Sequence, residues 1–597
     1  MPSLPASRKT VILVAVFVMA LTTITYLYGY SLQGSHPSRA WFSGFAYNIS
    51  DSSVYLSWIR QASDGHFFQR NFFTTDSQQG HQFNVFFLSL GFLVRITGLP
   101  PSVVYHVTRF ILGVALLWSV WWLLGLLLAN SRARMAAFLI TCFSSGLGWA
   151  SSGWDVIALS SPVDTWQPES ITFLSLYYSP LFSVSLLLMV GVIGWLWVAE
   201  QRQSYTAAIY AGICGFLLGN IHTYDVITVG AVWGGFLILR RLVHGKWPTQ
   251  AFRFGVIAGA ITFLSTAYTA YQVLTDPVFA KRAAVPTRSP SLFYYMVGYG
   301  LVFLLAIAGA WLLFKAGSSA RKQGDSTKGT SAAGEEVEKT PQRTQRTQRN
   351  AEEKLDVSGW VRGYDATLLL VAWTIINIAI TYIPISFQRR LLMGEHLPIS
   401  ALAGIGLAGI LPGLIAWKWR LLLAGVLPLL FISNGRFLMR DMDNLSVNQS
   451  MYTVVRPYLY AGERGALAWI REHTPPGSAV QPVPWSEVTD NGEVFLSDIT
   501  LATYSPGITG HPVHLGHWGE TPDFGGKVES WVYFMQPTTS DEWRQRFLRG
   551  SGLRYLLFTQ RVSGTRFPPI WSNPPSYLKR IEEASNADVD LYEVDLD

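Results

Sequence analysis

The stretch VILVAVFVMALTTITYLYGY, from Val11 to Tyr30, contains no charged side chain. A second uncharged run extends from Ile111 to Leu128, and similar runs recur through the first three quarters of the 597-residue chain. An apolar run of about 18 residues or more is long enough to cross a bilayer as a helix. The sequence therefore predicts a polytopic α-helical membrane protein.

The amount and the location of charge agree with this class. Only 14% of the residues are charged, whereas about 25% are charged in soluble domains. The formal net charge of +7 comes from basic residues in short hydrophilic gaps, such as Arg132, Arg134, Arg240 and Arg241. An excess of Lys and Arg in short loops is typical of the cytoplasmic side of membrane proteins, so no nucleic-acid partner is expected. No Walker A, HExxH or GxSxG pattern occurs, nor a GxGxxG after a strand.

The basic gaps also predict the topology. Arg8 and Lys9 precede the first run and no small-residue cleavage site follows it, so we expect an uncleaved first helix with a cytoplasmic N-terminus. About eleven spans are expected, in the plasma (inner) membrane, at residues 11–30, 103–129, 135–150, 178–199, 205–220, 223–241, 251–273, 292–314, 365–385, 399–416 and 419–434. The loops 31–102, 151–177, 274–291 and 386–398 then lie outside the cytoplasm, as does the chain after about residue 435.

Three segments complete the expected organisation, which is a transmembrane domain over 1–434 followed by an extracytoplasmic α/β domain over 435–597. Phe83 to Leu99 is apolar but short and carries Arg95, so we interpret it as a helix in the membrane interface within the first outside loop, 31–102. The polar stretch 317–363 predicts a disordered cytoplasmic loop. After 435, a helical run at 466–472 is followed by strand-like runs at 478–484, at 554–560 and at the C-terminus, which indicates a soluble α/β layer.

Asn48 to Phe73 is the most unusual part of the first outside loop. Its pattern predicts a helix that is capped by Ser50 or Asp51, lies flat on the membrane with its aromatic side down, and ends at Gly65. Asp51 then has two interpretations that do not exclude each other: it caps the helix, or it is a general base at the bilayer surface.

Two further outside segments carry candidate sugar- or acceptor-binding residues. Asp164 and Glu169 bracket Trp166, and carboxylates beside an aromatic ring suit a sugar or a divalent metal, although a plain solvated loop explains either carboxylate alone. His222 and Asp225 interrupt two apolar runs, where ionisable groups are costly and hence candidates for function. A tight outside turn at this position would lower that cost.

The segment FQRRLLMGEHLP, 387–398, places Arg389, Arg390, Glu395 and His396 in a late outside loop. Two outside arginines break the charge bias, and guanidinium groups pair well with phosphate. An ion pair with Glu395 or a lipid headgroup is the alternative. Arg109, at the outside end of its helix, is a further candidate for binding phosphate.

His511, His514 and His517 follow one another closely in a loop rich in Gly and Pro. Zinc sites use histidines, but this spacing is not a standard ligand spacing. We therefore favour a loop that reaches back over the membrane-facing site, and no metal ligand is assigned.

The segments ISDSSVY, GLPPSVVYHVTRF and FQRR…GEHLP together resemble the GT-C superfamily of membrane glycosyltransferases, which includes protein O-mannosyltransferases, aminoarabinose transferases of lipid A and oligosaccharyltransferases. In this resemblance Asp51 takes the place of the catalytic Asp. Ser52 and Ser53 follow it where relatives carry a second acidic residue, so a divalent metal is possible but not favoured.

The resemblance implies an inverting transfer of a sugar from a polyprenyl-phosphate donor to a hydroxyl of a lipid, glycan or protein acceptor. Asp51 would be the base, and Arg389, Arg390 and Arg109 would bind the donor phosphate. The sugar or the acceptor would be bound by Asp164, Trp166, Glu169, His222, Asp225, Glu395 and His396. A transporter or flippase of a lipid-linked saccharide, and a non-catalytic scaffold or receptor, are the alternatives.

Overall fold

The computed structural model describes residues 8–151, 158–330, 359–410, 425, 427–450, 454–488, 494–562, 565–566 and 574–596. The chain divides into two compact units. Unit 1 comprises 1–22, 109–267 and 286–437, and unit 2 comprises 23–108, 268–285 and 438–597. Sequence order places the first outside loop with the membrane helices, whereas in the structure it shares a unit with the C-terminal residues.

Seven helical segments within the described part of the chain are long and apolar enough to cross a membrane: Arg8–Leu32, Pro101–Leu127, Pro180–Arg202, Tyr224–His244, Thr249–Thr275, Leu292–Ala316 and Gln388–Ile410. Each overlaps an expected span. The expected spans at 205–220 and 365–385 correspond to the shorter helices α10 (Tyr205–Ile221) and α16 (Tyr364–Ile380). The span expected at 135–150 is the 13-residue helix α6 (Ser131–Phe143). In the span expected at 419–434, residues 419–424 and 426 lie outside the described residues, the 3-10 helix η6 covers Leu427–Leu430, and α19 (Ile432–Val447) begins.

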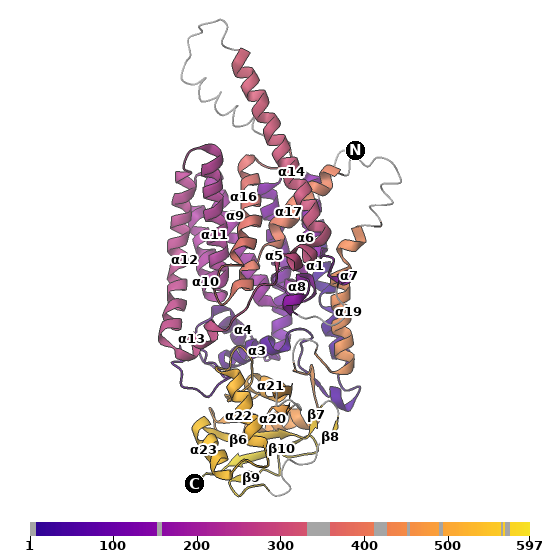
Figure 1. Ribbon diagram of the computed structural model, residues 1–597, viewed down its shortest axis with the longest axis vertical. Helices are drawn as coiled ribbons and strands as arrows, with labels where there is room; N and C mark the ends of the chain where they lie inside the picture. Colours follow the sequence, from indigo (N-terminus) through magenta and orange to yellow (C-terminus); the bar gives the residue numbers. More distant parts are fainter. Residues whose placement is uncertain are drawn as a thin grey trace. The chain divides into compact units, whose positions relative to one another are not determined.

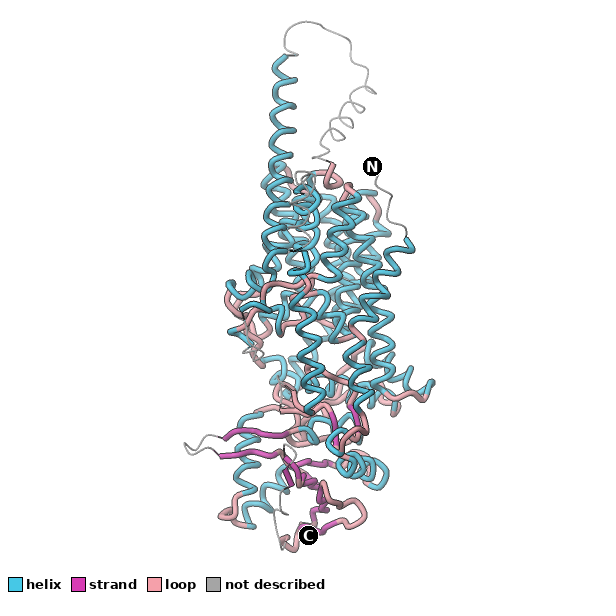
Figure 2. Tube along the Cα trace, turned by 90° about the vertical axis from the view of Figure 1, so that its right-hand side faces the viewer, coloured by secondary structure: helices cyan, strands magenta, loops and turns pink. Residues whose placement is uncertain are grey.

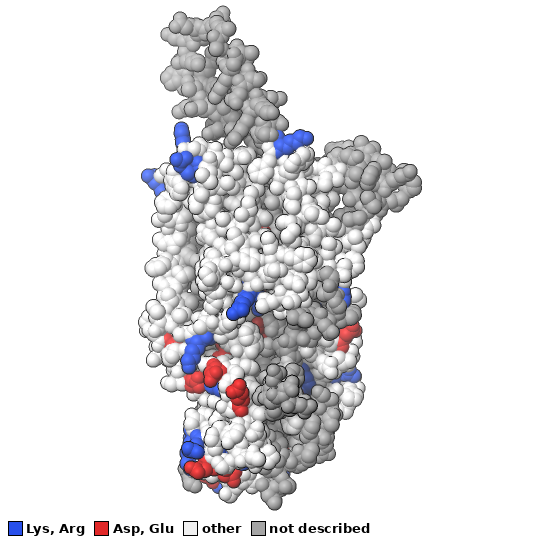
Figure 3. Space-filling view, in the orientation of Figure 1, with Lys and Arg blue, Asp and Glu red and all other residues white. Residues whose placement is uncertain are grey.

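The membrane-embedded part of the protein is a polytopic helical bundle. In unit 1, α10 packs on α9 (Pro180–Arg202), α11 (Tyr224–His244) packs on α16, and α17 (His396–Ile410) packs on both α6 and α14 (Leu292–Thr330). Figures 1 and 2 show these helices as long, roughly aligned elements. Over α12 (Thr249–Thr275), the surface is free of charge along most of its length, and basic side chains gather at the end joined to α11 (Figure 3).

Glycine lets α17 approach its neighbours closely. A Cβ atom on Gly404 would lie 2.5 Å from the backbone N of Ala137 in α6, and one on Gly406 would lie 2.1 Å from the carbonyl oxygen of Leu305 in α14. Small residues at such contacts are typical of helix packing in membranes. Gly300, with φ 47° and ψ −122°, interrupts α14 near its start.

Two helices of unit 2 form the core of the first outside loop. α3 (Ile49–Ser63) packs against α4 (Val85–Thr97) and against α21 (Thr500–Thr509). The rings of Tyr55 and Trp58 contact Phe87 of α4, and Trp58 is buried. The sequence predicts that the aromatic side of α3 faces the membrane. In the structure it faces protein instead. It is α4, the expected interfacial helix, that exposes apolar side chains, with Phe92 and Ile96 59% and 61% exposed.

Unit 2 contains all the described strands (Figure 2). A four-stranded sheet has the order β3-β6-β10-β9, built from β3 (Ala479–Pro482), β6 (Leu553–Thr559), β9 (Leu578–Arg580) and β10 (Val589–Val594). β3 is parallel to β6, and the other pairs are antiparallel. Two of the three two-stranded pairs are β4 (Trp485–Val488) with β5 (Val494–Asp498) and β7 (Arg561–Val562) with β8 (Thr565–Arg566). Besides α3, α4 and α21, unit 2 contains α13 (Pro277–Ala284), α20 (Ala461–His473), α22 (Phe524–Met535) and α23 (Asp541–Ser551). α19 (Ile432–Val447) begins in unit 1 and ends in unit 2. The helix expected at 466–472 and the strands expected at 478–484, 554–560 and the C-terminus are thus confirmed.

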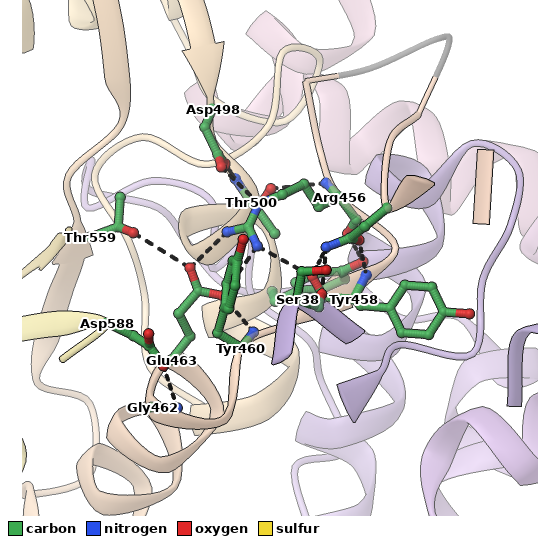
Figure 4. Close-up of polar contacts among 12 residues, drawn as sticks. Ser38, Arg456, Tyr458, Tyr460, Gly462, Glu463, Asp498, Thr500, Thr559 and Asp588 are labelled. Carbon is green, nitrogen blue, oxygen red and sulfur yellow. Dashed lines mark hydrogen bonds and ion pairs between the residues drawn. The ribbon is translucent and has the colours of Figure 1, made fainter. Parts of the chain in front are cut away.

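A two-stranded pair ties the first loop to the C-terminal residues. β1 (Trp41–Phe42) pairs with β2 (Tyr458–Leu459) in an antiparallel register that opposes Phe42 to Tyr458. Just before β2, Arg456 donates to Glu463 of α20 over 2.7 Å and to Asp498 of β5 over 2.9 Å (Figure 4). Because Glu463 is fully buried, this pairing supplies the counter-charge that burial requires. It fixes β2 against α20 and β5.

Candidate functional site

Asp51 lies in the first turn of α3, but it does not cap the helix. The cap residue is Asn48, which adopts a left-handed conformation with φ 43° and ψ 55°. Asparagine tolerates this region better than most residues do. Its side-chain Nδ2 donates to Oδ2 of Asp51 over 2.7 Å. The expectation that Ser50 or Asp51 caps α3 is therefore wrong, and the carboxylate is held by a neighbouring amide instead.

The second partner of Asp51 is His517, from the loop between α21 and α22. Nε2 of His517 lies 3.0 Å from Oδ1 of Asp51. On the other side of the ring, Nδ1 accepts the backbone N–H groups of Gly519 and Glu520, each over 3.1 Å. Because Nδ1 is an acceptor, the proton of the neutral ring is on Nε2, which donates to Asp51.

This pair has one buried and one accessible member. The side chain of His517 is 3% exposed, and that of Asp51 is 31% exposed. Phe73 packs edge-to-face on the imidazole with 5.7 Å between ring centroids. A carboxylate has about four lone-pair positions, and the hydrogen bonds from Asn48 and His517 use two of them. Asp51 is therefore oriented through both oxygens while still reachable from solvent.

A second ion pair anchors the His517 loop to α13. Arg282, near the end of α13, donates from Nε to Glu520 over 2.7 Å. Its guanidinium lies 4.8 Å from the centroid of the Trp58 ring on α3. Asn71 donates to the carbonyl oxygen of Glu520 over 2.7 Å. The loop thus reaches back over Asp51, and its position is fixed from two directions.

The three histidines of this loop have different partners. Nε2 of His511 lies 2.8 Å from the Thr474 hydroxyl, and His514 accepts from the indole N–H of Trp531 over 3.3 Å. Burial lowers the pKa of both rings, that of His514 to about 4. Among the described residues, no group of three or more His, Cys, Asp or Glu side chains is placed to hold a metal ion.

Unit 1 brings together residues from three segments predicted to be outside. Arg389 and Arg390 lie in the 3-10 helix η4 (Gln388–Leu392). The guanidinium of Arg389 is 5.0 Å from the Trp166 ring centroid, and that of Arg390 is 5.0 Å from the Tyr224 ring centroid. Such stacking uses the face of a guanidinium and not its N–H groups. The Nε of Arg389 has no hydrogen-bond partner among the described residues.

The turn between α10 and α11 holds a hydrogen-bonded chain. Nδ1 of His222 lies 2.8 Å from Oδ2 of Asp225, which also accepts a hydrogen bond from the Ser185 hydroxyl. Asp225 is fully buried. The hydroxyl of Thr228 donates to the carbonyl oxygen of Leu391 over 3.0 Å, so this turn packs on η4.

Asp164 supports the backbone around it. Oδ2 of this fully buried residue accepts the N–H groups of Gly146 and Gly148, over 3.0 and 3.1 Å. Burial raises the pKa of Asp164 to about 6, against the opposing effect of these hydrogen bonds. A Cβ on Gly148 would lie 2.3 Å from Oδ1 of Asp164. The Asp164 carboxylate therefore holds the backbone at Gly146 and Gly148 in place. The other carboxylate of this segment, Glu169, is 8% exposed.

The remaining candidates are buried. Arg109 donates from Nη1 to the Thr22 hydroxyl and to the carbonyl oxygen of Leu176, over 3.0 and 2.8 Å. Both ring nitrogens of His396 are engaged, with the hydroxyls of Ser144 and Thr172. Glu395 is fully buried, and neither of its carboxylate oxygens has a hydrogen-bond partner in the described part of the chain.

Sequence reasoning did not pair His517 with Asp51, and it assigned no role to Asn48, Arg282 or Glu520. The close spacing of the three histidines was the available signal. It drew attention to their loop, but the sequence gives no means of pairing a histidine with a carboxylate 466 residues away.

The fold is similar to those of solved membrane enzymes. A variant of the arabinofuranosyltransferase AftD from Mycobacteria matches at 14% identity with a TM-score of 0.51, and the match covers 100% of this chain and 42% of AftD. ArnT from Cupriavidus metallidurans bound to undecaprenyl phosphate matches at 13% identity with a TM-score of 0.46 over 97% of each chain. An oligosaccharyltransferase from Archaeoglobus fulgidus, tethered with an acceptor peptide, matches at 11% identity with a TM-score of 0.48 over 91% of this chain and 69% of that chain.

No protein-family model and no curated protein matches the sequence. This chain spans less than half the length of AftD, and the match extends over its whole length. The chain therefore shares its fold with part of the mycobacterial arabinofuranosyltransferase AftD.

Proposed function

We propose that the chain is a membrane glycosyltransferase that moves a sugar from a polyprenyl-phosphate donor to an acceptor hydroxyl, with Asp51 as the general base. The observation that carries this proposal is the environment of Asp51, oriented by Asn48 and His517 and yet 31% exposed. A general base needs a fixed carboxylate within reach of the proton that it removes. A fold supports many activities, but that of a protein named an arabinofuranosyltransferase agrees with sugar transfer.

The proposed step is a single displacement. The acceptor hydroxyl gives its proton to Asp51 as its oxygen forms a bond to the anomeric carbon. The bond from that carbon to the phosphate oxygen breaks on the opposite face, and its electron pair leaves with the lipid phosphate. The sugar configuration is therefore inverted. His517 keeps its Nε2 proton throughout and stabilises Asp51 as the anion that accepts the acceptor's proton.

Arg389 and Arg390 are the groups that we assign to the donor phosphate. Stacking on Trp166 and Tyr224 restrains each guanidinium before a donor binds. Arg389 makes no ion pair with any described residue, and its buried Nε has no hydrogen-bond partner among them. Fixed cations that meet a leaving phosphate stabilise the charge that develops in the transition state. Arg109 is less suited to this role, because its Nη1 is already hydrogen-bonded inside the helices.

The test is turnover by the full chain, purified in detergent, with radiolabelled polyprenyl-phosphate sugars and a mixture of lipid, glycan and peptide acceptors. The variant Asp51→Asn keeps the shape of the side chain but cannot accept the proton, so turnover should fall by about 10²–10⁴-fold. Asp443→Asn changes an exposed carboxylate on α19 and serves as the matched control.

Unchanged turnover in Asp51→Asn would remove the assigned base. A second outcome would favour the transporter alternative. In that outcome the chain transfers sugar from no donor but moves a lipid-linked saccharide across the membrane of reconstituted vesicles.

A further inference from the structure

A cavity of about 780 Å³ lies in unit 2, at the end of α3 away from Asp51. Arg60 and Arg70 line it from the first outside loop, Arg471 from the last turn of α20, and His511 from the loop after α21. An α-helix rises 1.5 Å per residue, so the cavity begins about 14 Å from Asp51 along the same helix. Ligand pockets have volumes of about 300–1,000 Å³, so this cavity is large enough for part of an oligosaccharide.

The charges that line the cavity do not cancel. Two carboxylates face it, and each already has its own cation: Asp64 pairs with Arg60 over 2.7 Å, and Asp76 pairs with Lys527 over 2.9 Å. Arg70 and Arg471 make no ion pair with any described residue. The cavity therefore retains two guanidinium groups that form no ion pair within the described part of the chain.

Two of the arginines also lie close together. Burial and the positive charge of Arg60 lower the pKa of Arg471, against the opposing effect of the carboxylates of Asp64 and Glu472. Burial and Arg60 also lower the pKa of His511. Like charges that converge on one concave surface repel each other, and an anion bound between them relieves the repulsion. The recess thus favours a negatively charged ligand over a neutral one.

An aromatic ring at the cavity gives a second feature of the ligand. Phe68 lines it and is 45% exposed, and its ring packs edge-to-face on that of Phe67, which is 57% exposed. A partly exposed ring suits the apolar face of a pyranose. Guanidinium forks beside such a ring match a saccharide that carries acidic groups better than they match a free inorganic anion.

We propose that this cavity binds an anionic segment of the acceptor, namely a glycan that bears carboxylate or phosphate groups. The end of α3 lines the cavity and Asp51 lies in the first turn of the same helix, so a chain seated between Arg70 and Arg471 brings a hydroxyl several sugar units further along to Asp51. The term acceptor rests on the proposed function, whereas binding at the cavity does not require turnover.

The test is calorimetric titration of the full chain in detergent with four probes. Tetragalacturonate and pentamannose phosphate supply the two kinds of anion on a saccharide, maltotetraose is neutral, and inorganic pyrophosphate is an anion without a sugar. We expect at least one anionic saccharide to bind more tightly than maltotetraose and pyrophosphate, and the tighter of the two identifies the acidic group. The double variant Arg70→Gln/Arg471→Gln should weaken that binding about tenfold, or ~1.4 kcal/mol.

Two controls separate this proposal from the proposed function. Arg546→Gln removes an exposed arginine of α23 that lies outside the cavity, and it should bind as the wild type does. Asp51→Asn should also bind normally, because the base is not part of the cavity. Binding that depends on Arg70 and Arg471 in a chain without turnover would support the cavity and overturn the proposed function.

Three results would overturn the cavity proposal: equal binding of maltotetraose and the anionic saccharides, tighter binding of pyrophosphate in competition with them, or unchanged binding in the double variant. Thermal unfolding of each variant checks folding. If the double variant unfolds, the single change Arg471→Gln on exposed helix surface provides the same comparison.

Discussion

His517 donates a hydrogen bond from Nε2 to Oδ1 of Asp51, although 466 residues separate the two in sequence. The direction of this bond follows from the other side of the ring, where two backbone N–H groups occupy Nδ1. We expect His517 to be a positioning residue, because it acts on the carboxylate rather than on the substrate.

His517→Gln should preserve part of this role, since the amide can still donate to Asp51, whereas His517→Phe should lose it. We expect kcat to fall about tenfold in the first variant and about 100-fold in the second, with KM for the donor unchanged. Initial-rate measurements with both variants across pH 5–8 provide the comparison. Equal rates for the Phe variant and the wild type would show that His517 only packs against Phe73.

Asn48 combines a left-handed conformation with a hydrogen bond to Asp51, and two substitutions separate these contributions. Asn48→Gly tolerates the conformation but loses the bond, so it should unfold near the wild-type temperature and still have a lower kcat. Asn48→Ala loses both and should be less stable by about 1–2 kcal/mol. The measurements are the thermal unfolding temperature and the turnover rate of each variant. If both variants are equally stable, the left-handed conformation at Asn48 does not strain the backbone.

His514 should make stability depend on pH. Burial lowers its pKa from 6.5 to about 4, so between these values the unfolded chain binds a proton that the folded chain does not. Stability is then fully present above pH 6.5 and decreases as the pH falls toward 4, by up to roughly 3 kcal/mol. His514→Gln should flatten thermal unfolding temperatures over this window. The exposed His473→Gln is the control, and the same slope in both variants would contradict the assignment.

The glycines of α17 should be intolerant of side chains. Gly406→Ala places a methyl group 2.1 Å from the carbonyl oxygen of Leu305, and overpacking of this kind costs about 1–3 kcal/mol. Gly259→Ala in α12 is the matched control, since no atom lies within 4 Å of the new Cβ. Yield of folded protein after detergent extraction and thermal unfolding should both fall for the first variant only.

Arg389 should affect the donor more than the acceptor. Arg389→Gln keeps a polar group over Trp166 but removes the charge, so kcat/KM for the polyprenyl-phosphate sugar should fall about 10–100-fold. Arg389→Lys should recover only part of this loss, because an ammonium group lacks the planar fork. The exposed Arg288→Gln should have no effect. An unchanged donor KM and kcat in Arg389→Gln would remove this arginine from the phosphate site.

Local patterns were sufficient to predict the membrane class and most of the elements. Uncharged runs gave the positions of the long helices, and α20, β3, β6 and β10 appear where helical or β-like spacing occurs in the sequence. Spacing also drew attention to the segments around Trp166, Tyr224 and Arg389, which pack together in unit 1.

The errors have a common physical cause. The apolar face of α3 looks the same whether it meets lipid or protein, and the structure covers it with α4 and α21. Aspartate is a common helix cap, but the carboxylate of Asp51 accepts hydrogen bonds from Asn48 and His517 instead. In both cases the deciding partner lies outside the local window, so periodicity could not reveal it.

The pairing of β1 with β2 has a consequence for biogenesis. Trp41 and Phe42 leave the ribosome long before Tyr458 and Leu459, the residues that they must pair with. At 5–20 residues per second, synthesis of the 466 residues that separate Asp51 from His517 takes roughly 25–90 s. During that interval α3 lacks both α21 and the histidine that orients its carboxylate. Assembly of this part of the protein is thus timed by the end of translation, and a nascent chain released before His517 would carry an unfinished site.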